Sequence, residues 1–242
     1  MTVSIERNDG VATVFLDRPQ QRNAITGPLG VALADSLSEL SHDSSVNVIV
    51  LAGRGNAFCS GLDLKAFNAD PPPPWLPEFK TIWRNAHRAL FNCPKPIVGA
   101  LERYAINGGA ALALACDLLI AGREAFLHVG EARLGMGAPY NIAWMRMRLP
   151  ETAAMQLALI ARRFTGPELV SLGVATECVD DDAVLARAQA LAAELAAFPD
   201  GALERIKRSF RRYAPTIEAD PYFDLAFLDA GGAPPPTLET QR

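Results

Sequence analysis

Aromatic residues, histidines and cysteines are all scarce in this chain of 242 residues. Aromatic residues make up 7% of it, and there are only three histidines. The four cysteines are far apart and form no CxxC pair: Cys59, Cys93, Cys116 and Cys178. No paired histidines lie near them, so a zinc site and a disulfide framework are both disfavoured. We therefore expect no metal, and reduced thiols in a cytoplasmic protein.

The chain also lacks a long apolar segment and an excess of positive charge. Its most apolar stretch, 110–121, is interrupted by Asp117 and is shorter than the ~20 residues of a membrane-spanning helix. The first residues have neither the basic start nor the apolar stretch of a signal peptide. With 23 Lys and Arg against 27 Asp and Glu, the net charge is −4. A nucleic-acid-binding surface normally has the opposite sign, so we expect neither a membrane nor a nucleic acid as partner.

Hydrophobic residues, in contrast, make up half of the chain, which is enough for a sizeable core. The alternation from Val3 to Phe15 around Asn8-Asp9-Gly10 predicts a β-hairpin. Thr26 resembles a helix N-cap, with Pro28 in the first turn and leucines at 29, 33, 37 and 40 on one helical face. Apolar runs at 46–51, 96–101 and 118–121 predict buried strands, and 109–116 predicts a helix. This order predicts an α/β fold.

Helical patterns dominate the second half of the chain. Helices are expected at 142–148, 152–161, 182–198 and 202–213, with one strand among them at 173–179. Proline runs at 71–74 and 234–236 predict a surface loop and a frayed tail. We expect residues 1–185 to form the body that contains the functional site. Residues 186–242 would then form a helical region and tail that packs on a neighbour or over the site.

The familiar catalytic motifs have little support. His42 lies at a predicted helix end and His87 in a polar helical stretch, so we expect solvated roles for both. Gly53-Arg54-Gly55 is no dinucleotide loop, because Phe58 stands where the third glycine belongs. Ser60 lies in a turn without the two glycines of a nucleophile elbow. A Ser-His-Asp triad is therefore weakly supported.

Two glycine-bearing turns remain, each after an apolar strand and each opening toward a helix. They are Ser60-Gly61-Leu62-Asp63 and Asn107-Gly108-Gly109-Ala110. Backbone N–H groups at such turns are free to bind, and the dipole of the following helix strengthens them. Two converging N–H groups would form an oxyanion hole, which stabilises negative charge on a carbonyl oxygen. The residues alone leave the alternative that both are only tight turns.

At these turns the sequence resembles the crotonase (enoyl-CoA hydratase/isomerase) family. Five segments are similar to family motifs and occur in family order: Asp17-Arg18-Pro19 with Asn23-Ala24-Ile25, Asn56 to Leu64, Pro94 to Val98, Tyr104 to Gly109, and Ala115 to Ala121. The agreement spans roughly residues 5–180. Each motif is moderately specific alone, and their common order makes the resemblance strong.

The resemblance implies an α/β fold of repeated ββα units wound into a spiral, with a helical C-terminal region used for trimerisation. It implies a homotrimer, or a hexamer made of two trimers. It also implies an acyl-CoA thioester substrate and no cofactor besides the coenzyme A that the substrate itself carries. The oxyanion donors would be the backbone N–H groups of Leu62 and Gly108.

The resemblance also implies which residues contact the substrate. These are Arg22, Ala24, Ser60, Asp63, Leu64, Gly109, Ala111 and Tyr140. The segment 227–232 lacks the basic ending that helps cover coenzyme A in relatives. Arg22 and Lys65 are the candidates for holding the coenzyme A phosphates here, although each is equally interpretable as a solvated surface charge.

Family hydratases carry two glutamates, and this chain carries only the second. The first position is Ala111 and the second is Glu131. Adding water commonly requires two acid–base groups, whereas a double-bond shift requires one base that moves a proton between C2 and C4. The sequence therefore favours an enoyl-CoA isomerase with Glu131 as general acid/base. A surface carboxylate in a loop is the alternative interpretation of Glu131.

Other departures keep further functions open. Gly130 replaces a proline common in the family, and 136–141 lacks the usual glycines. A different acid or base could come from one of four residues, Tyr140, Asn141, Trp144 or His128, which would permit hydration. A non-catalytic acyl-CoA-binding relative is a second alternative. The basic strip of Arg205, Lys207, Arg208, Arg211 and Arg212 leaves a nucleic-acid-binding relative open, although we expect it on an exposed or interface helix face.

Overall fold

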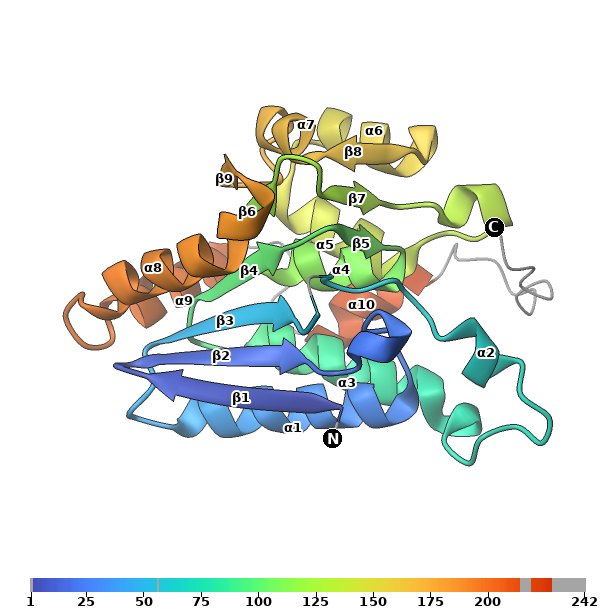
Figure 1. Ribbon diagram of the computed structural model, residues 1–242, viewed down its shortest axis with the longest axis horizontal. Coiled ribbons are helices and arrows are strands. Elements are labelled where there is room, and N and C mark those ends of the chain that lie inside the picture. The colour runs from blue at the N-terminus through green and yellow to red at the C-terminus, as the bar shows by residue number, and fades with distance from the viewer. Residues whose placement is uncertain (1, 56, 214–218, 228–242) are drawn as a thin grey trace.

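The computed structural model describes residues 2–55, 57–213 and 219–227 (Figure 1). The strands form two sheets, and helices pack on both faces of the larger one. The proline run at 234–236 and most of the segment 227–232 lie outside the described residues. The expected division between 1–185 and 186–242 stays a prediction.

The first two strands form the hairpin that the Asn8-Asp9-Gly10 turn predicts. β1 (Val3–Asn8) pairs antiparallel with β2 (Val11–Leu16), and Asn8 lies opposite Val11. Asp9 and Gly10 both have positive φ, 42° and 81°. Two such residues in a two-residue loop match the right-handed twist of the strands that they join.

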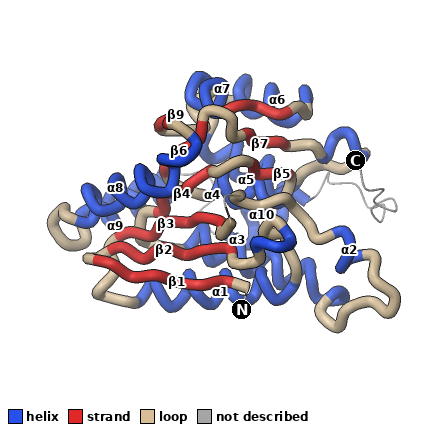
Figure 2. Tube along the Cα trace, viewed as in Figure 1, coloured by secondary structure: helices blue, strands red, loops and turns tan. Residues whose placement is uncertain are grey.

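The larger sheet has the strand order β1-β2-β3-β4-β6-β9 (Figure 2). Beyond the hairpin its strands are β3 (Val48–Gly53), β4 (Ile97–Leu101), β6 (Leu118–Gly122) and β9 (Glu177–Val179). Every pair from β2 onward is parallel. Residues of β3, β4 and β6 are almost all buried, which explains their unbroken apolar runs. The three expected central strands are confirmed, and β9 is shorter than the expected 173–179.

The smaller sheet was not expected from the sequence. It consists of β5 (Tyr104–Ile106), β7 (Phe126–His128) and β8 (Arg163–Thr165). The pair β5–β7 is parallel and β7–β8 is antiparallel. The expectation of a single strand in the second half is wrong, because β8 and β9 both lie there. Three residues are too few for an alternating pattern to be recognised.

Helices occupy the segments between the strands. They are α1 (Gly27–His42), α2 (Leu64–Phe67), α3 (Phe79–Asn92), α4 (Gly108–Ala115), α5 (Pro139–Arg148), α6 (Glu151–Ile160), α7 (Gly166–Ser171), α8 (Val184–Ala196), α9 (Ala202–Tyr213) and α10 (Ala219–Phe227). Shorter 3-10 helices are η1 (Pro19–Gln21), η2 (Leu76–Glu78), η3 (Glu131–Leu134) and η4 (Asp181–Ala183). The expected helices correspond to α1, α4, α5, α6, α8 and α9. Within the described ranges, no helix has both the length and the apolarity needed to cross a bilayer.

The two faces of the larger sheet belong to two cores, as alternation of side chains along a strand requires. Val48 and Val50 of β3 pack in a cluster with Ala188 of α8. Ile49 and Leu51 face the other way, into the cluster that contains residues of α1, α3 and α4. The Oγ1 of Thr26 accepts a hydrogen bond from the N–H of Leu29 at 3.4 Å, so the expected cap of α1 is confirmed. The four expected leucines of α1 are fully buried.

His87 does not have the solvated role expected for it. It lies on the buried face of α3 together with Trp83 and Leu90, and 0% of its surface is exposed. The spacing of these residues, four and three apart, places them on one side of the helix. The polar residues that made the stretch look solvated lie on the opposite side. The expectation of a solvated His87 is wrong, because the helical spacing of the apolar residues, and not the polarity of adjacent residues, decides which side of α3 is buried.

The basic strip on α9 is only partly exposed. Arg205 and Arg208 are exposed, whereas Lys207 forms an ion pair of 2.6 Å with Asp117. The guanidinium of Arg211 lies 4.8 Å from the centre of the Phe91 ring. Two of the basic residues therefore attach α9 to the core. The side chain of Arg212 lies outside the described part of the chain.

The chain passes repeatedly from the larger sheet to the smaller one and then into a helix. β4 leads to β5 and α4, and β6 leads to β7, η3 and α5. Cys59 forms a parallel bridge with Ala105 in β5, whose other neighbour is the parallel strand β7. Three parallel segments thus end at the same edge. Residues 60–63, 107–110 and 129–131 follow them and are brought together there.

Candidate active site

The first turn, residues 60–63, is held between β5 and the segment that precedes α1. The N–H of Ile25 donates to the carbonyl of Gly61 at 2.8 Å, and the N–H of Asp63 donates back to Ile25 at 3.0 Å. Gly61 has a φ of 89°, in the region that favours glycine. The N–H of Leu62 donates no hydrogen bond to any described residue. This group is therefore available to an external acceptor.

The second turn begins α4 and is held by Asn107. The N–H of Asn107 donates to the carbonyl of His128 at 2.8 Å, and its φ is 49°. Its own carbonyl accepts the N–H of Ala111 at 3.1 Å. The N–H groups of the next three residues have no carbonyl before them in the helix, as at any helix start. The N–H of Gly108 is therefore also available.

The two turns are in close backbone contact. A Cβ atom on Gly61 would lie 2.9 Å from the carbonyl oxygen of Ile106. A Cβ atom on Gly109 would lie 2.6 Å from the carbonyl oxygen of Cys59. Only glycine permits both approaches, since real Cβ atoms do not come so near to backbone oxygens. Leu62 directly follows Gly61, and Gly108 directly precedes Gly109. The N–H groups of Leu62 and Gly108 therefore lie in two turns that are in contact.

Glu131 is buried, not a surface carboxylate. It begins η3, immediately after the third parallel segment, and only 8% of its surface is exposed. Its Oε1 accepts a hydrogen bond of 2.8 Å from Asn141 Nδ2, whereas Oε2 is buried and has no partner in the described part of the chain. Burial raises the pKa of Glu131 to about 7, and the hydrogen bond from Asn141 opposes this rise. A carboxyl group with this pKa can both take and release a proton near neutral pH.

Asn141 joins Glu131 to the second turn. Its Nδ2 also donates to the carbonyl of Asn107 at 3.1 Å. Asn141 lies on α5, 34 residues after Asn107 and ten after Glu131. The sequence identified it only as one of four possible sources of another acid or base. No local pattern could have indicated these contacts, because they depend on how α5 packs on α4.

A neutral aromatic wall lies beside the second turn. A Cβ atom on Gly108 would lie 3.8 Å from Cζ2 of Trp83. The rings of His87 and Tyr140 stack with centroids 4.1 Å apart, and Trp144 Nε1 donates to His87 Nδ1 at 2.9 Å. Burial lowers the pKa of His87 to about 3 and raises that of Tyr140. Both side chains therefore stay neutral at physiological pH.

Asp63 has structural partners that the sequence did not indicate. Its Oδ2 forms an ion pair of 2.8 Å with Arg18, and its Oδ1 accepts the N–H of Ala66 at 3.1 Å. The guanidinium of Arg18 also donates to the carbonyl of Ala24. Asp63 thus caps α2 and ties it to the segment that precedes α1. Its expected contact with the substrate stays a prediction.

The remaining expected site residues lie around the two turns. Ala111 is fully buried on α4, so a methyl group occupies the position of the first family glutamate. Arg22 and Lys65 are exposed. The carbonyl of Arg22 accepts the N–H of Ser60 at 3.1 Å, which places it next to the first turn. Leu64 begins α2, directly after Asp63.

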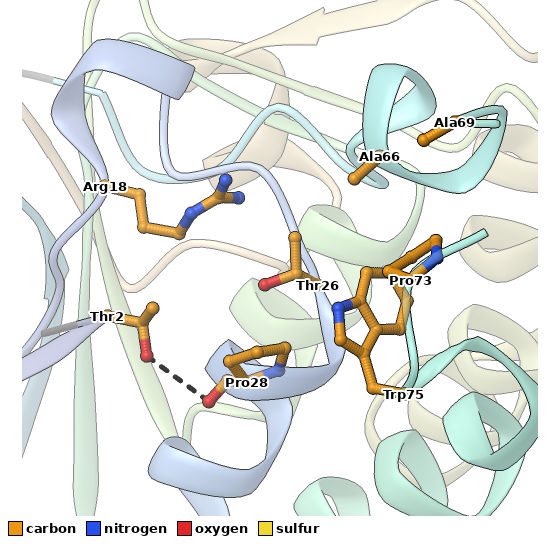
Figure 3. Close-up of a pocket in the computed structure, with 8 residues that line it drawn as sticks. All are labelled: Thr2, Arg18, Thr26, Pro28, Ala66, Ala69, Pro73 and Trp75. Carbon is orange, nitrogen blue, oxygen red and sulfur yellow. Dashed lines mark hydrogen bonds between the residues drawn. The ribbon is translucent and has the colours of Figure 1, made fainter. Parts of the chain in front are cut away.

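A surface hollow of about 360 Å³ lies between α2 and the start of α1 (Figure 3). Arg18, Thr26 and Trp75 surround it in Figure 3. None of the expected site residues lines it. Two of its lining residues, Arg18 and Ala66, contact Asp63 of the first turn, so the hollow adjoins that turn. No group of three or more His, Cys, Asp or Glu side chains suited to a metal ion occurs in the described part of the chain.

The chain is similar to enzymes that act on coenzyme A thioesters. A family model described as enoyl-CoA hydratase/isomerase matches residues 6–222. The 1,2-epoxyphenylacetyl-CoA isomerase of Escherichia coli K12 is 32% identical over 221 residues, which cover 89% of this chain and 84% of that protein.

Solved structures agree in fold. The structure of a carnitinyl-CoA dehydratase from Mycobacterium avium 104 matches with a TM-score of 0.82 and 28% identity, covering 95% of this chain and 90% of that one. An enoyl-CoA hydratase from Mycobacterium avium subsp. paratuberculosis K-10 matches with a TM-score of 0.80 and 26% identity, covering 93% and 90%. The expected crotonase-like α/β fold is confirmed. The chain belongs to the enoyl-CoA hydratase/isomerase family.

Proposed function

We propose that the protein binds acyl-CoA thioesters and catalyses proton transfer at the carbon next to the thioester carbonyl. The backbone N–H groups of Leu62 and Gly108 bind the thioester oxygen, and Glu131 moves the proton. The observation that carries this proposal is the buried carboxyl group of Glu131, hydrogen-bonded through Asn141 to the turn that presents Gly108.

The two N–H groups are required because a thioester α-proton is only weakly acidic. Removing it places negative charge on the thioester oxygen, as an enolate. A preorganised donor aimed at such an oxygen is worth about 3 kcal/mol, so two donors lower the barrier substantially. Both N–H groups are free to bind this oxygen, since neither the N–H of Leu62 nor that of Gly108 has a hydrogen-bond partner among the described residues.

We propose double-bond isomerisation as the main reaction, because one carboxylate suffices for it. The Glu131 carboxylate removes a proton from C2 of a 3-enoyl thioester, and the electron pair of the C–H bond enters a dienolate. Glu131 then returns the proton to C4, and the electrons of the dienolate form the C2=C3 double bond and restore the carbonyl. The buried methyl group of Ala111 offers no second acid–base group. One relative is also named as an isomerase, and the substrate in its name is the epoxide 1,2-epoxyphenylacetyl-CoA.

Hydration of a 2-enoyl thioester is the second candidate. A similar structure is named as an enoyl-CoA hydratase, and both reactions pass through the same kind of stabilised enolate. Hydration requires a further acid or base to activate water, and of the four candidates Tyr140, Asn141, Trp144 and His128, only His128 and Tyr140 have titratable side chains. Burial lowers the pKa of His128, which makes its imidazole a weaker base, and raises the pKa of Tyr140, which makes its phenol a weaker acid. Isomerisation is therefore preferred.

The contacts of the coenzyme A arm follow from the same proposal. Ala24, Ser60, Asp63, Leu64 and Gly109 line the arm and thioester near the first turn, and Ala111 and Tyr140 lie toward the acyl group. The exposed side chains of Arg22 and Lys65 contact the phosphates. We further propose a homotrimer, or a hexamer of two trimers, in the cytoplasm.

A panel of enoyl-CoA thioesters tests the proposal. Short, long, branched and aromatic 3-enoyl and 2-enoyl thioesters are incubated with the protein, and products are followed by NMR and mass spectrometry. We expect movement of the double bond between C3 and C2 in at least one acyl class, without a gain of the mass of water. Hydration alone would favour the second candidate. Tight binding without any product would identify a non-catalytic acyl-CoA-binding protein.

A further inference from the structure

The side-chain amide of Asn141 contacts both parts of the candidate active site. Its Nδ2 donates to Glu131 Oε1 at 2.8 Å and to the carbonyl oxygen of Asn107 at 3.1 Å. The NH2 group has two hydrogens, so both are used. Only 2% of the surface of Asn141 is exposed, so water does not compete for these bonds.

The contact with Asn107 acts directly on the Gly108 donor. The carbonyl of Asn107 and the N–H of Gly108 belong to one planar peptide group and point in opposite directions. A hydrogen bond to the carbonyl therefore fixes the direction of the N–H. It also polarises the peptide group, which makes the N–H a stronger donor. The amide of Asn141 thus supports the proposed oxyanion donor from its opposite end.

The contact with Glu131 selects which carboxylate oxygen reacts. Oε1 is engaged by Asn141, whereas Oε2 is buried and has no partner among the described residues. A proton can therefore be taken up at Oε2 while Oε1 stays anchored. Because one amide group holds both Oε1 and the Asn107 carbonyl, the distance between the base and the oxyanion donor is set by a single planar group.

Core stability alone does not explain an asparagine at this position. Its Oδ1 is buried and accepts no hydrogen bond from a described residue, which is unfavourable. An apolar side chain of similar size would fill the same space without burying that oxygen. The two hydrogen bonds that Nδ2 donates, to Glu131 and to the carbonyl of Asn107, explain why an amide is present here.

We propose that Asn141 is a positioning residue that sets the geometry and the proton affinity of Glu131 relative to the Gly108 donor. The inference rests on the proposed function, since it assigns Asn141 to the same reaction. Asn141 makes no contact with the substrate in this account. It acts through Glu131 and through the peptide group between Asn107 and Gly108.

Two variants test the proposal. Asn141→Leu keeps the size of the side chain and removes both donors. Asn141→Asp keeps the shape, and its ionised form can only accept hydrogen bonds and places a second negative charge beside Glu131. We expect each variant to lower kcat at least about tenfold with KM changed less than about threefold, because positioning affects the reacting geometry more than binding.

The pH profile separates a positioning role from a merely structural one. Loss of the hydrogen bond that stabilises the Glu131 carboxylate raises the pKa of that group. The acidic limb of the rate profile should therefore move to higher pH in both variants, by about one pH unit. A ¹³C NMR titration of the Glu131 carboxyl in substrate-free protein, assigned with Glu131→Gln, should move in the same direction. A general loss of stability would lower the rate without moving either titration.

Ile142→Ala is the matched control, because Ile142 is the next residue on α5 and is 42% exposed. It should leave kcat and the acidic limb unchanged. If Asn141→Leu and Asn141→Asp retain both the kcat and the acidic limb of the parent protein, the inference is wrong, even when Glu131→Gln is inactive. If the parent protein catalyses no proton transfer at all, the proposed function fails instead, and the NMR titration still shows whether Asn141 controls the proton affinity of Glu131.

Discussion

The side-chain Oδ1 of Asn107 accepts a hydrogen bond of 2.8 Å from the backbone N–H of Gly130. Each of these residues directly precedes a candidate site residue, Gly108 in one case and Glu131 in the other. The bond therefore joins the start of α4 to the start of η3 across 23 residues of sequence. Together with the Asn141 bridge, it joins the turn that presents Gly108 and the carboxyl group of Glu131 into one connected unit.

The pH dependence of the reaction should report Glu131. In the proposed reaction its carboxylate form is the base, and burial raises the pKa of Glu131 to about 7. The value of kcat/KM should therefore rise with pH through about 7 and then level off. Steady-state rates between pH 5 and 9 measure this. A profile without an acidic limb near neutral pH would mean that a different group takes the proton.

Glu131 should also make stability depend on pH. Its folded-state pKa is about 7, above the value of 4.5 for an unperturbed group, so the folded protein binds the proton more tightly. Stability is then lost as pH rises from about 4.5 to about 7. Glu131→Gln removes this loss, so at pH 8 the variant should be more stable than the parent by roughly 1–3 kcal/mol.

Urea denaturation at pH 5 and pH 8 measures this difference. The exposed Glu124 provides the control, because Glu124→Gln should give the same change in unfolding free energy at both pH values. An equal stability of Glu131→Gln and the parent at pH 8 would contradict the burial of an ionisable group at this position.

Two neighbouring glycines should respond very differently to an added methyl group. On Gly109 the new Cβ would meet the Cys59 carbonyl oxygen at 2.6 Å, and this backbone cannot move without separating the two turns. On Gly108 the nearest atom is Cδ1 of Ile25 at 2.9 Å, the mobile end of a side chain. Gly109→Ala should therefore lower the unfolding free energy by roughly 1–3 kcal/mol, and Gly108→Ala by less than about 1 kcal/mol.

Thermal and urea unfolding of the two alanine variants, compared with the parent, test this pair. The comparison is internally controlled, since both substitutions add one methyl group to the same helix start. Equal losses of stability would show that the contact between the two turns is not as close as described.

The Trp144–His87 hydrogen bond should stabilise the aromatic wall. His87 Nε2 is already buried with no partner among the residues that the structure describes, so Trp144→Phe leaves neither ring nitrogen with such a partner. A buried polar atom without a partner costs roughly 1–3 kcal/mol. Urea unfolding of Trp144→Phe should show at least this loss. Trp75→Phe serves as the comparison, because Trp75 is only half-buried and donates no hydrogen bond to a described residue. A similar small loss in both variants would argue against the hydrogen bond.

Long, regular elements could be predicted from the sequence because their patterns extend over many residues. The leucines of α1 and the apolar runs of β3, β4 and β6 each repeat a signal several times. Strands β5, β7 and β8 have three residues each and give no such repeat. They are nevertheless the elements that bring the site together, since the turns follow the ends of β5 and β7 and the bridge at Cys59.

The site itself was only partly predictable. The glycine turns and the position of Glu131 are local features, and the family resemblance gave them an order. The burial of Glu131 and its contact with Asn141 depend on the packing of α5, which no local spacing encodes. The burial of His87 was likewise not predicted, because polar residues lie close to it in the sequence although it lies on the apolar side of α3.

Exchange of the α-proton of a bound saturated acyl-CoA with deuterium from the solvent tests the central claim most directly. It requires only enolate formation, so it does not depend on the position of a double bond or on water addition. We predict exchange in the parent protein and a loss of at least about 10² in rate in Glu131→Gln. Exchange at the same rate in both proteins would show that Glu131 does not move the proton, and its absence from both would show that no enolate forms in this site.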